Sequence, residues 1–587
     1  MEKVEQSSSL PPLPEVHHKD DNQYSKEDLE THVEAFNPSP SYHERRGTFK
    51  TVCLIMTCTA AMILNTANAT AISIALPTIG RDLNIVEYKL QWLVSAYSLS
   101  SGCLLLFLGR LADLYGRKRT FLLGIAFQGA FGLGCAFAQD EVTIDILRGF
   151  QGIGGAAIIP AALGTLAHAF PPSRLRSFAF ASFGAGAPVG ASVGNLIGGV
   201  LTELTPQSWR ATLYMMTGLS AIAFLGGAFS IDPDILDMNQ DRRIDWLGAL
   251  LVTAGLVLIL FVLSDGSVAP NGWRTGYIIA LLVIGVLLIV AFLLWQHYLE
   301  SVHYKALQSP DDAALAKSKW TPPPLMKLSV WKLAKGRLAV IFWIGFLEWF
   351  SFNSFSFWLQ LYYQDFEGLS SIQTMLRFLP MSVSGVICNL IVALVVGYVD
   401  FMILIALGMS LTAVANLLFA VIDVNASYWA YGFPAAVICV FGADFVMAAG
   451  SLFVAKFSPL DDQSVSGAVL QTMMQLGGAF GLAITTIIFN ETLSNQSAKF
   501  GVSINQSGTN ASSAPHQAQE SAYRAAMWGG FAFGVLGAVL AAVFLNGVGI
   551  VGHVERKKSA MGDSQEPESV GEEGRSRGDS ATSVEKA

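Results

Sequence analysis

The stretch Gly109–Thr120 reads GRLADLYGRKRT and joins two apolar runs, residues 89–109 and 119–138. Four basic residues surround its single acid, Asp113, and its two glycines permit a tight turn and a close approach of helices. A charged stretch of this kind indicates a short loop that anchors the ends of two membrane helices. The isolated acid indicates in addition a specific ion pair or helix-end contact, with a plain basic anchor as the alternative.

The composition of the whole chain is that of a membrane protein. Of its 587 residues, 52% are hydrophobic and 14% are charged, whereas soluble domains carry about 25% charged residues. A single soluble core stops growing at about 250–300 residues, so the apolar excess must face lipid. The net charge of −8 comes without a basic patch, which argues against a nucleic-acid partner. The six cysteines show no metal-ligand spacing, so we expect neither a metal nor a cofactor.

About fourteen apolar runs reach the length of about 20 residues that a helix needs to cross a bilayer. Among them are the predicted spans 209–230, 246–264, 275–297, 464–489 and 524–552. We therefore predict an all-α integral membrane protein in a 6+2+6 arrangement. Its predicted parts are a disordered tail (1–50), a six-helix half (51–230), two extra helices (246–297), a linker (298–337), a second six-helix half (338–552) and a disordered tail (553–587). Related halves of this kind place a transport pathway between them.

The charges of the loops predict the orientation in the membrane. Basic residues gather in the quoted loop, in the linker 298–337 and beside both tails, and all of these fall on one side of a fourteen-helix chain. Because Lys and Arg in short loops mark the cytosolic side, we expect both termini in the cytosol. The loop 490–523 then lies outside, and its sequons at Asn505 and Asn510 are glycosylation candidates. An unmodified polar loop is the alternative.

GRLADLYGRKR resembles the signature loop of the major facilitator superfamily, which has the form G-x-L-x-D-x-x-G-R-K-x. ALPTIGRDL at 75–83 and LQWLVSAYSL at 90–99 are similar to the fourteen-span drug:proton antiporter branch. GNLIGG at 194–199 and the aromatic-rich span 338–363 together resemble, more loosely, the fungal aminotriazole-resistance-like subgroup. The resemblance implies the major facilitator fold and a gate that holds the two halves together on the inner side. The implied gate residues are Gly109, Arg110, Asp113, Gly116, Arg117, Lys118 and Arg119.

LRGFQGIGGAAIIPAA at 147–162 is similar to the family's fourth-span motif, whose matching arginine, here Arg148, is implied in proton transfer. A charge inside a span costs several kcal/mol unless it is paired or faces water, which makes Arg148 a functional candidate. A structural pair with Asp145, one turn earlier, is the alternative. The glycines of this stretch lie inside a span, so they indicate helix packing rather than a nucleotide site.

The fifth span, GAGAPVGASVGNLIGG at 184–199, carries small residues at every fourth position, which favours close helix packing. The helix-packing residues are Gly186, Gly190, Gly194, Gly198 and Gly199. This span resembles the motif associated with exporters, except that Asn195 stands where that motif has proline. In the first span, Asn68 stands where the branch usually has an acid, so proton coupling must be sought elsewhere.

Two intramembrane acids, Glu348 and Asp444, join Arg148 as proton-coupling candidates, since a charge in a span is functional by default. An acid at a helix end or facing water is the alternative. The span 338–363 is rich in aromatic residues with a few polar residues between them, which suits an amphiphilic or cationic ligand. A lipid-facing aromatic helix is the alternative. The substrate-cavity candidates are Asn68, Gln151, Trp349 and Asn353.

These observations predict a secondary active transporter that works by alternating access. It would export a small organic compound, such as a drug, toxin or secondary metabolite, with the proton gradient as its energy source. We expect a monomer in the lipid bilayer of the plasma membrane, with the vacuolar membrane as the alternative. An uptake-direction or low-affinity ion or nutrient permease is the alternative function, and a non-transporting membrane sensor is the remote one. Without a catalytic triad or a nucleotide loop in the sequence, we expect no enzyme activity.

Overall fold

The computed structural model of the chain describes residues 47–86, 89–170, 174–234, 241, 243–266, 269–308, 318, 320–459, 463–502 and 514–550. These residues form helices without a strand, and fourteen of the helices in this part of the chain are long and apolar enough to cross a membrane. The predicted all-α chain of about fourteen spans is thereby confirmed. Residues 1–46 and 551–587 of the two predicted tails, and the glycosylation candidates Asn505 and Asn510, lie outside the described residues.

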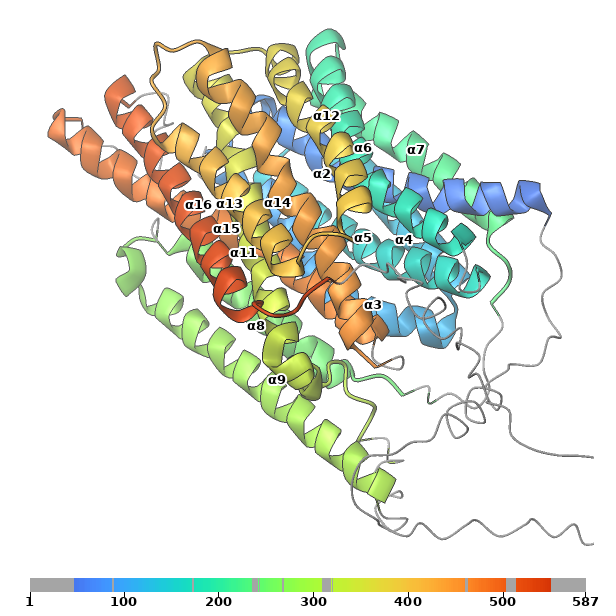
Figure 1. The fold of residues 1–587 in the computed structure, drawn as a ribbon. Coiled ribbons are helices and arrows are strands. Elements are labelled where there is room, and N and C mark those ends of the chain that lie inside the picture. The colour runs from blue at the N-terminus through green and yellow to red at the C-terminus, as the bar shows by residue number, and fades with distance from the viewer. Residues whose placement is uncertain are drawn as a thin grey trace, which may run out of the picture. The chain divides into compact units, whose positions relative to one another are not determined.

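The helices follow one another in the order drawn in Figure 1. The first six are α2 (Thr48–Leu83), α3 (Gln91–Tyr115), α4 (Arg117–Ala136), α5 (Glu141–Ala169), α6 (Arg174–Leu204) and α7 (Trp209–Ser230). Two more follow, α8 (Trp246–Asp265) and α9 (Gly276–Gln308). After a 3-10 segment, η3 (Leu328–Gly336), come α11 (Arg337–Leu361) with a π-helical turn η4 (Tyr362–Phe366), α12 (Ser371–Val395), α13 (Phe401–Ala420), α14 (Tyr428–Phe457), α15 (Gln463–Lys499) and α16 (His516–Phe544).

The helices α2–α7 and α11–α16 pack in the same pattern, and we call these sets the first and second halves. In the first half α4 contacts α5 and α7, and in the second half α13 contacts α14 and α16 at the corresponding places. In the same way, α3 packs on α5 and α12 packs on α14. Such internal repetition is common in secondary transporters, whose binding sites lie where the repeats meet.

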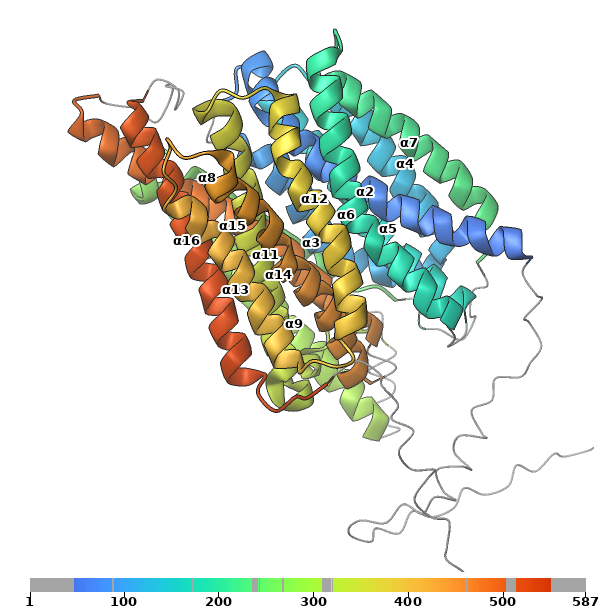
Figure 2. The ribbon, with the colours of Figure 1, turned by 45° about the horizontal axis from the view of Figure 1, so that its top comes forward.

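The halves meet along two helix pairs, α3 with α15 and α6 with α12. Both pairs can be followed in Figures 1 and 2, in which blue and green helices of the first half lie beside yellow and orange helices of the second. The extra helices pack on the outside of one of these pairs: α8 contacts both α3 and α15, and α9 packs mainly on α8. We call the α3–α15 and α6–α12 contacts the two seams, and a transport pathway between the halves would run between them.

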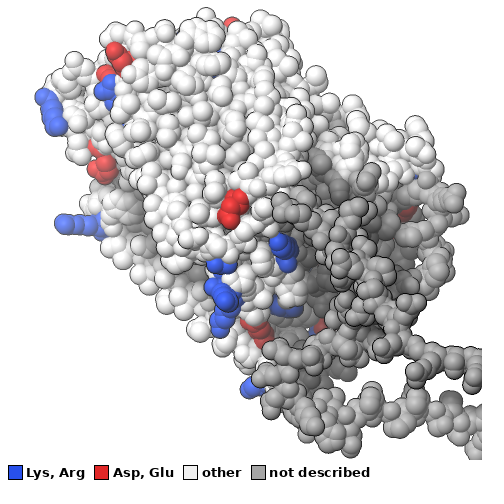
Figure 3. All heavy atoms as spheres, in the orientation of Figure 1, with Lys and Arg blue, Asp and Glu red and all other residues white. Residues whose placement is uncertain are grey.

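Large apolar side chains cover the outer surfaces of the helices. α9 alone exposes several, among them Leu282, Val283, Ile284, Leu287 and Leu294. Figure 3 shows one face of the molecule on which basic and acidic residues are few and wide areas carry neither. Apolar surface of this extent is unfavourable in water and suits the hydrocarbon of a bilayer.

Several helix ends differ from the predicted ones. α9 continues to Gln308 although the span was expected to end at 297, and α15 continues to Lys499 although its span was expected to end at 489. The last helix, α16, begins at His516 and ends at Phe544, whereas the sequence predicted 524–552. The expected outer loop 490–523 was wrong in its bounds for this reason. Hydropathy marks where a chain leaves hydrocarbon, and a helix continues as long as its backbone hydrogen bonds do.

Candidate functional site

The quoted loop is a single-residue turn at Gly116, which separates α3 from α4. Gly116 has φ +112°, a conformation that side chains disfavour. A Cβ added there would lie 2.2 Å from Asp234 Oδ2. The Asp234 carboxylate accepts hydrogen bonds from the backbone N–H groups of Lys118 (2.9 Å) and Arg119 (3.2 Å), so it caps the first turn of α4. Glycine is required here both by the backbone conformation and by the carboxylate.

We expect Gly116→Ala to destabilise the protein by about 1–3 kcal/mol, because the substitution adds backbone strain and displaces the cap. Thermal unfolding of the detergent-purified protein, followed by intrinsic fluorescence, would show a lowered midpoint. Gly218→Ala is the matched control, since a Cβ there would meet no atom within 4 Å. An unchanged midpoint for Gly116→Ala would contradict the role assigned to the turn.

The charged side chains of the loop contact other parts of the first half. Arg117 donates to Asp113 (3.1 Å) and to the Gly164 carbonyl of α5 (3.0 Å). Lys118 Nζ donates to the carbonyl oxygens of Ala228 (2.8 Å) and Ile231 (2.6 Å) at the end of α7. None of these four groups, nor Asp234, belongs to the second half. We call this end of the bundle the motif end, and the opposite end the far end.

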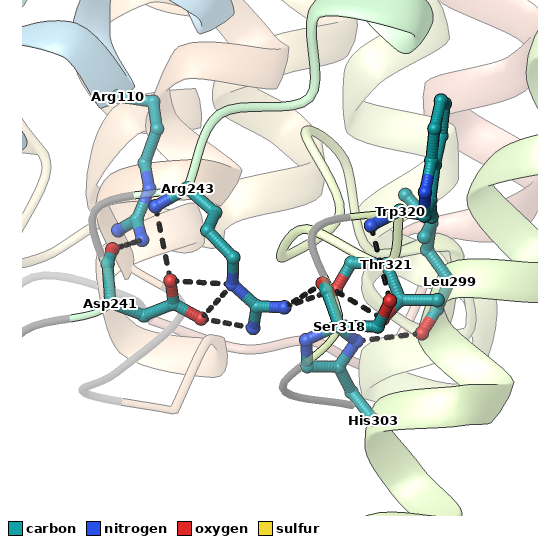
Figure 4. A network of polar contacts seen from close by, with 8 residues as sticks. All are labelled: Arg110, Asp241, Arg243, Leu299, His303, Ser318, Trp320 and Thr321. Carbon is teal, nitrogen blue, oxygen red and sulfur yellow. Dashed lines mark hydrogen bonds and ion pairs between the residues drawn. The ribbon is translucent and has the colours of Figure 1, made fainter. Parts of the chain in front are cut away.

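Arg110 connects the loop to the segment that leads into the extra helices. Its Nη2 donates to the Asp241 carbonyl at 3.1 Å, and Arg243 hydrogen-bonds the Asp241 carboxylate and, at 3.1 Å, the Thr321 carbonyl (Figure 4). The hydrogen bonds from Arg243 hold the pKa of Asp241 below its ordinary value. Figure 4 shows that these contacts run from Arg110 on α3, through Asp241 and Arg243 before α8, to Thr321 before η3. The motif end is thus tied to the linker between the halves.

At the far end, the two halves are joined directly. Gln364 of η4 donates to the Ile74 carbonyl of α2 at 3.0 Å, and the backbone N–H of Ile372 donates to Glu203 of α6 at 2.9 Å. Gly199 lies against α12, since a Cβ there would be 3.1 Å from Met375 Cβ. Hydrophobic residues from both halves also form one buried cluster near this end. The described contacts therefore hold the far end of the seam shut.

The first half contains a buried polar group that we call the arginine cluster, formed by Asn65, Asn68, Tyr97, Gln128, Arg148 and Gln151. Arg148 is fully buried and donates to the Leu93 carbonyl (2.8 Å) and to Gln151 Oε1 (2.6 Å). Gln151 Nε2 in turn donates to Asn68 Oδ1 at 3.1 Å. The structure thus brings together three of the residues that the sequence singled out.

Arg148 has no acid as an ion-pair partner within the part of the chain that the structure describes. Its charge lies over the Tyr97 ring, with Cζ 4.7 Å from the ring centroid, and its Nη2 atom is buried without a hydrogen-bond partner. Asp145 forms no ion pair with it, and Asp145 Oδ1 is itself without a partner. The cation is held by carbonyl oxygens and a π face, so the structural pair with Asp145 is not formed in this conformation.

The second half contains a corresponding group, the glutamate cluster, formed by Glu348, Ser351, Thr412 and Asn416, all of which are fully buried. Glu348 Oε1 lies 2.7 Å from Thr412 Oγ1, while Glu348 Oε2 has no partner. Asn416 Nδ2 donates to Ser351 Oγ at 3.1 Å, and Ser351 Oγ donates to the Gly530 carbonyl at 2.9 Å. Among the described residues, no basic side chain forms an ion pair with Glu348.

The other second-half candidates do not join this cluster. Asp444 is half-buried beside Cys388 and Asn389, near the α6–α12 seam, and its Oδ2 atom has no partner. Trp349 is partly buried, with its ring 6.4 Å from that of Phe352. Asn353 faces α15, since a Cβ added at Gly478 would lie 2.1 Å from Asn353 Nδ2. These residues lie along α11 and α14 rather than in one site.

The glycine stripe of α6 faces α2. Ideal Cβ atoms would approach α2 closely all along it, at 3.0 Å from the Thr59 carbonyl oxygen for Gly186, 2.4 Å from the Ile63 carbonyl oxygen for Gly190, 2.1 Å from Thr70 Oγ1 for Gly194 and 2.3 Å from Ile74 Cγ2 for Gly198. Gly199 points to the other half, as noted above. Close backbone approach is what small residues permit in membrane helices.

No motif in the sequence marked some residues that the structure makes prominent. Asp234 caps α4, and Thr412 contacts Glu348, but neither stands at a fixed spacing from its partner.

A pocket of about 380 Å³ lies at the far end of the second half. One of the residues that line it is Arg377, which pairs with Glu367 and lies 4.7 Å from the Tyr363 ring centroid. The clustering of aromatic residues around 362–366 was the available signal for this pocket.

Among the described residues, two repeating halves of six membrane-spanning helices each meet along two seams, two further spans lie beside them, and each half holds a buried polar cluster. This arrangement defines a membrane transporter of the two-bundle type. The sequence profile described as Major Facilitator Superfamily matches residues 58–243 and again 235–482. The chain belongs to this superfamily.

Three relatives match more than two thirds of the chain. The puromycin resistance protein pur8 of Streptomyces alboniger is 30% identical over 73% of this chain and 80% of its own length. The low affinity ammonium transporter of Saccharomyces cerevisiae is 26% identical over 68% of this chain and 74% of its own. The aminotriazole resistance protein of the same yeast is 25% identical over 76% and 78%. The resemblance to the aminotriazole-resistance-like subgroup is consistent with the last of these.

A solved structure shares the fold. The crystal structure of an auto-inhibited POT family peptide transporter matches with a TM-score of 0.56 over 84% of this chain and 96% of that one, at 15% sequence identity. The major facilitator fold predicted from the quoted loop is thereby confirmed.

Proposed function

We propose that this transporter exports a small organic compound by alternating access, driven by protons that move inward. The buried carboxyl group of Glu348 carries the proposal. An ionised carboxylate in a fully buried site without a cation is costly by several kcal/mol, so the site favours a neutral acid and can bind or release a proton when its surroundings change. Asp444 is a second intramembrane acid, half-buried on α14, and Arg148 is a fixed charge in the first half.

The export direction is supported by the relatives. Two of them are named for resistance to puromycin and to aminotriazole, which fits removal of a toxic compound from the cell. The basic loops at the motif end support a cytosolic location for that end, because Lys and Arg in short loops favour the cytosolic side. With the motif end in the cytosol, the far end would face outward, and the contacts of Gln364 and Ile372 close it. A closed outer end is expected of an exporter while it takes up its substrate from the cytosol.

An accumulation assay tests the direction of transport. Yeast cells that express the chain should accumulate less labelled puromycin or aminotriazole than cells with the empty vector, and collapse of the proton gradient should remove the difference. Equal accumulation of every compound tried, with the protein present in the membrane, would count against export of this class of compound. Higher accumulation on expression would contradict export outright.

A second candidate function is low-affinity uptake of a small ion. It is favoured by the relative named as a low affinity ammonium transporter, and by Asn68 and Asn195 at positions where exporters of this branch carry other residues. Growth on limiting ammonium separates the two functions, because only the uptake function predicts faster growth when the chain is expressed in cells that lack their own ammonium transporters.

A further inference from the structure

The third helices of the two halves carry equivalent residues. Gly124 and Gln128 are four residues apart on α4, and Gly408 and Thr412 are four residues apart on α13. Each glycine faces the next helix closely: a Cβ would lie 3.0 Å from the Gly154 carbonyl oxygen of α5 in the first case and 3.2 Å from Gly442 Cα of α14 in the second. Gln128 and Thr412 therefore occupy corresponding places in the repeat.

Each of these polar residues contacts the first helix of its own half. Gln128 Nε2 lies 3.4 Å from Asn65 Oδ1 of α2, and Thr412 Oγ1 lies 2.7 Å from Glu348 Oε1 of α11. Glu348 is therefore the counterpart of Asn65. The first half has an uncharged amide at this place, whereas the second half has an acid, so the group able to exchange a proton lies in the second half.

Thr412 lies between two acceptors but has one hydroxyl hydrogen. Its Oγ1 is 2.7 Å from Glu348 Oε1 and 2.9 Å from the carbonyl oxygen of Cys439 on α14. When Glu348 is ionised, the hydroxyl hydrogen must turn to the carboxylate. When Glu348 takes up a proton on Oε1, the acid can donate to Thr412 Oγ1, which is then free to donate to Cys439. The pair therefore holds one proton more in the acid form than in the carboxylate form, and this is the proton that it takes up and releases.

Charged groups around this contact are few. α13 presents Thr412, α14 presents the Cys439 thiol and, farther away, Asp444, and within the described residues Asp444 is the one charged side chain that acts on Glu348. Gly442 allows α14 to come this near, since a Cβ there would lie 2.2 Å from Thr412 Oγ1 and 2.5 Å from Glu348 Oε1. Among the residues that the structure describes, Glu348 Oε2 has no hydrogen-bond partner and no basic side chain pairs with Glu348, so the Thr412 hydroxyl is the donor to this carboxyl group.

We infer that Glu348 and Thr412 form a proton-binding pair in which Thr412 is a positioning residue, and in which the hydroxyl hydrogen passes between Glu348 and the backbone of α14 as the proton binds and leaves. The inference rests on the proposed proton-driven function and names the site that couples it. α14 also carries Asp444, whose Oδ2 lies 3.7 Å from an ideal Cβ at Gly385, a position that packs on Pro188 of α6. A change at Cys439 therefore acts on a helix beside the seam between the halves.

Infrared difference spectroscopy of the purified protein tests the pair without a substrate. The carbonyl band of the protonated Glu348, identified by its loss in Glu348→Gln, should disappear as the pH is raised. Thr412→Val keeps the volume but removes the hydroxyl, so the carboxylate loses its donor. Because a hydrogen bond to a charged group is stronger than one to a neutral group, the midpoint should move up by about one to two pH units.

Two variants make the result specific. Thr412→Ser keeps a hydroxyl at this place and should titrate with the midpoint of the wild type. Ser410→Ala removes an exposed hydroxyl from the same helix and should also leave the midpoint unchanged. If Thr412→Val does not fold, Thr412→Cys, a weaker donor, should give a smaller shift in the same direction.

Each outcome has a distinct meaning. A midpoint that is the same in the wild type and Thr412→Val would overturn the pair. Absence of a titrating band that Glu348→Gln removes would overturn the proton site itself. Neither result depends on transport, so a failure of the proposed export in cells is distinguishable from a failure of this inference.

Discussion

Glu348→Gln should abolish transport driven by a pH gradient in proteoliposomes, reducing it to the rate of protein-free liposomes. The amide has nearly the shape of the acid, and its oxygen can still accept the Thr412 hydrogen bond, but it cannot take up or release a proton. Because the side chain is fully buried and has no basic partner among the described residues, the substitution removes the proton site with little change in packing. Binding of substrate at fixed pH should survive.

The control for this substitution is Glu491→Gln, which removes an exposed acid near the end of α15 and should leave the gradient-driven rate unchanged. The assay uses the compound that the accumulation experiment identifies, with an imposed inward proton gradient. A gradient-driven rate in Glu348→Gln equal to that of the wild type would show that the proton is carried elsewhere, and Asp444→Asn would then be the next variant to measure.

The sequence predicted the helices well because the bilayer imposes their length. A run of about 20 apolar residues has one stable arrangement in hydrocarbon. The predicted span 209–230 therefore has the same bounds as α7, and the predicted span 246–264 differs from α8 by one residue at its end. The errors fall where this constraint ends. α15 continues past 489 through polar residues such as Asn495, and water permits a helix there as readily as a loop.

The site could be predicted only in part, for a related reason. Arg148 and Glu348 were found because a charge in an apolar run is costly and therefore conspicuous. Thr412 and Asp234 were not found, since a hydroxyl in a span is common and an acid after a span is ordinary. Their importance arises from contacts across 64 residues for Thr412 and Glu348 and 116 residues for Asp234 and Lys118, and no local pattern reports such distances.

The helix contact between α2 and α6 leads to the second prediction of large effect. At Gly194 a Cβ would lie 2.1 Å from Thr70 Oγ1, 2.6 Å from the Ala67 carbonyl oxygen and 2.8 Å from Ala67 Cα. Two of these atoms belong to the backbone of α2, so they cannot move aside as a flexible side chain would. The Thr70 hydroxyl also donates to the Ala191 carbonyl of α6 at 3.3 Å, a contact that requires the helices to stay close.

Gly194→Val should therefore prevent the first half from assembling. Overpacking of a core costs about 1–3 kcal/mol where side chains can adjust, and a clash with backbone exceeds this range. We expect no monodisperse peak in fluorescence-detected size-exclusion chromatography of detergent extracts, and Gly194→Ala should lower the thermal midpoint. Gly184→Val is the matched control on the same helix, because a Cβ at Gly184 would meet no atom within 4 Å. If Gly194→Val elutes and unfolds as the wild type does, the two helices do not need this close approach, and the glycine stripe has another cause.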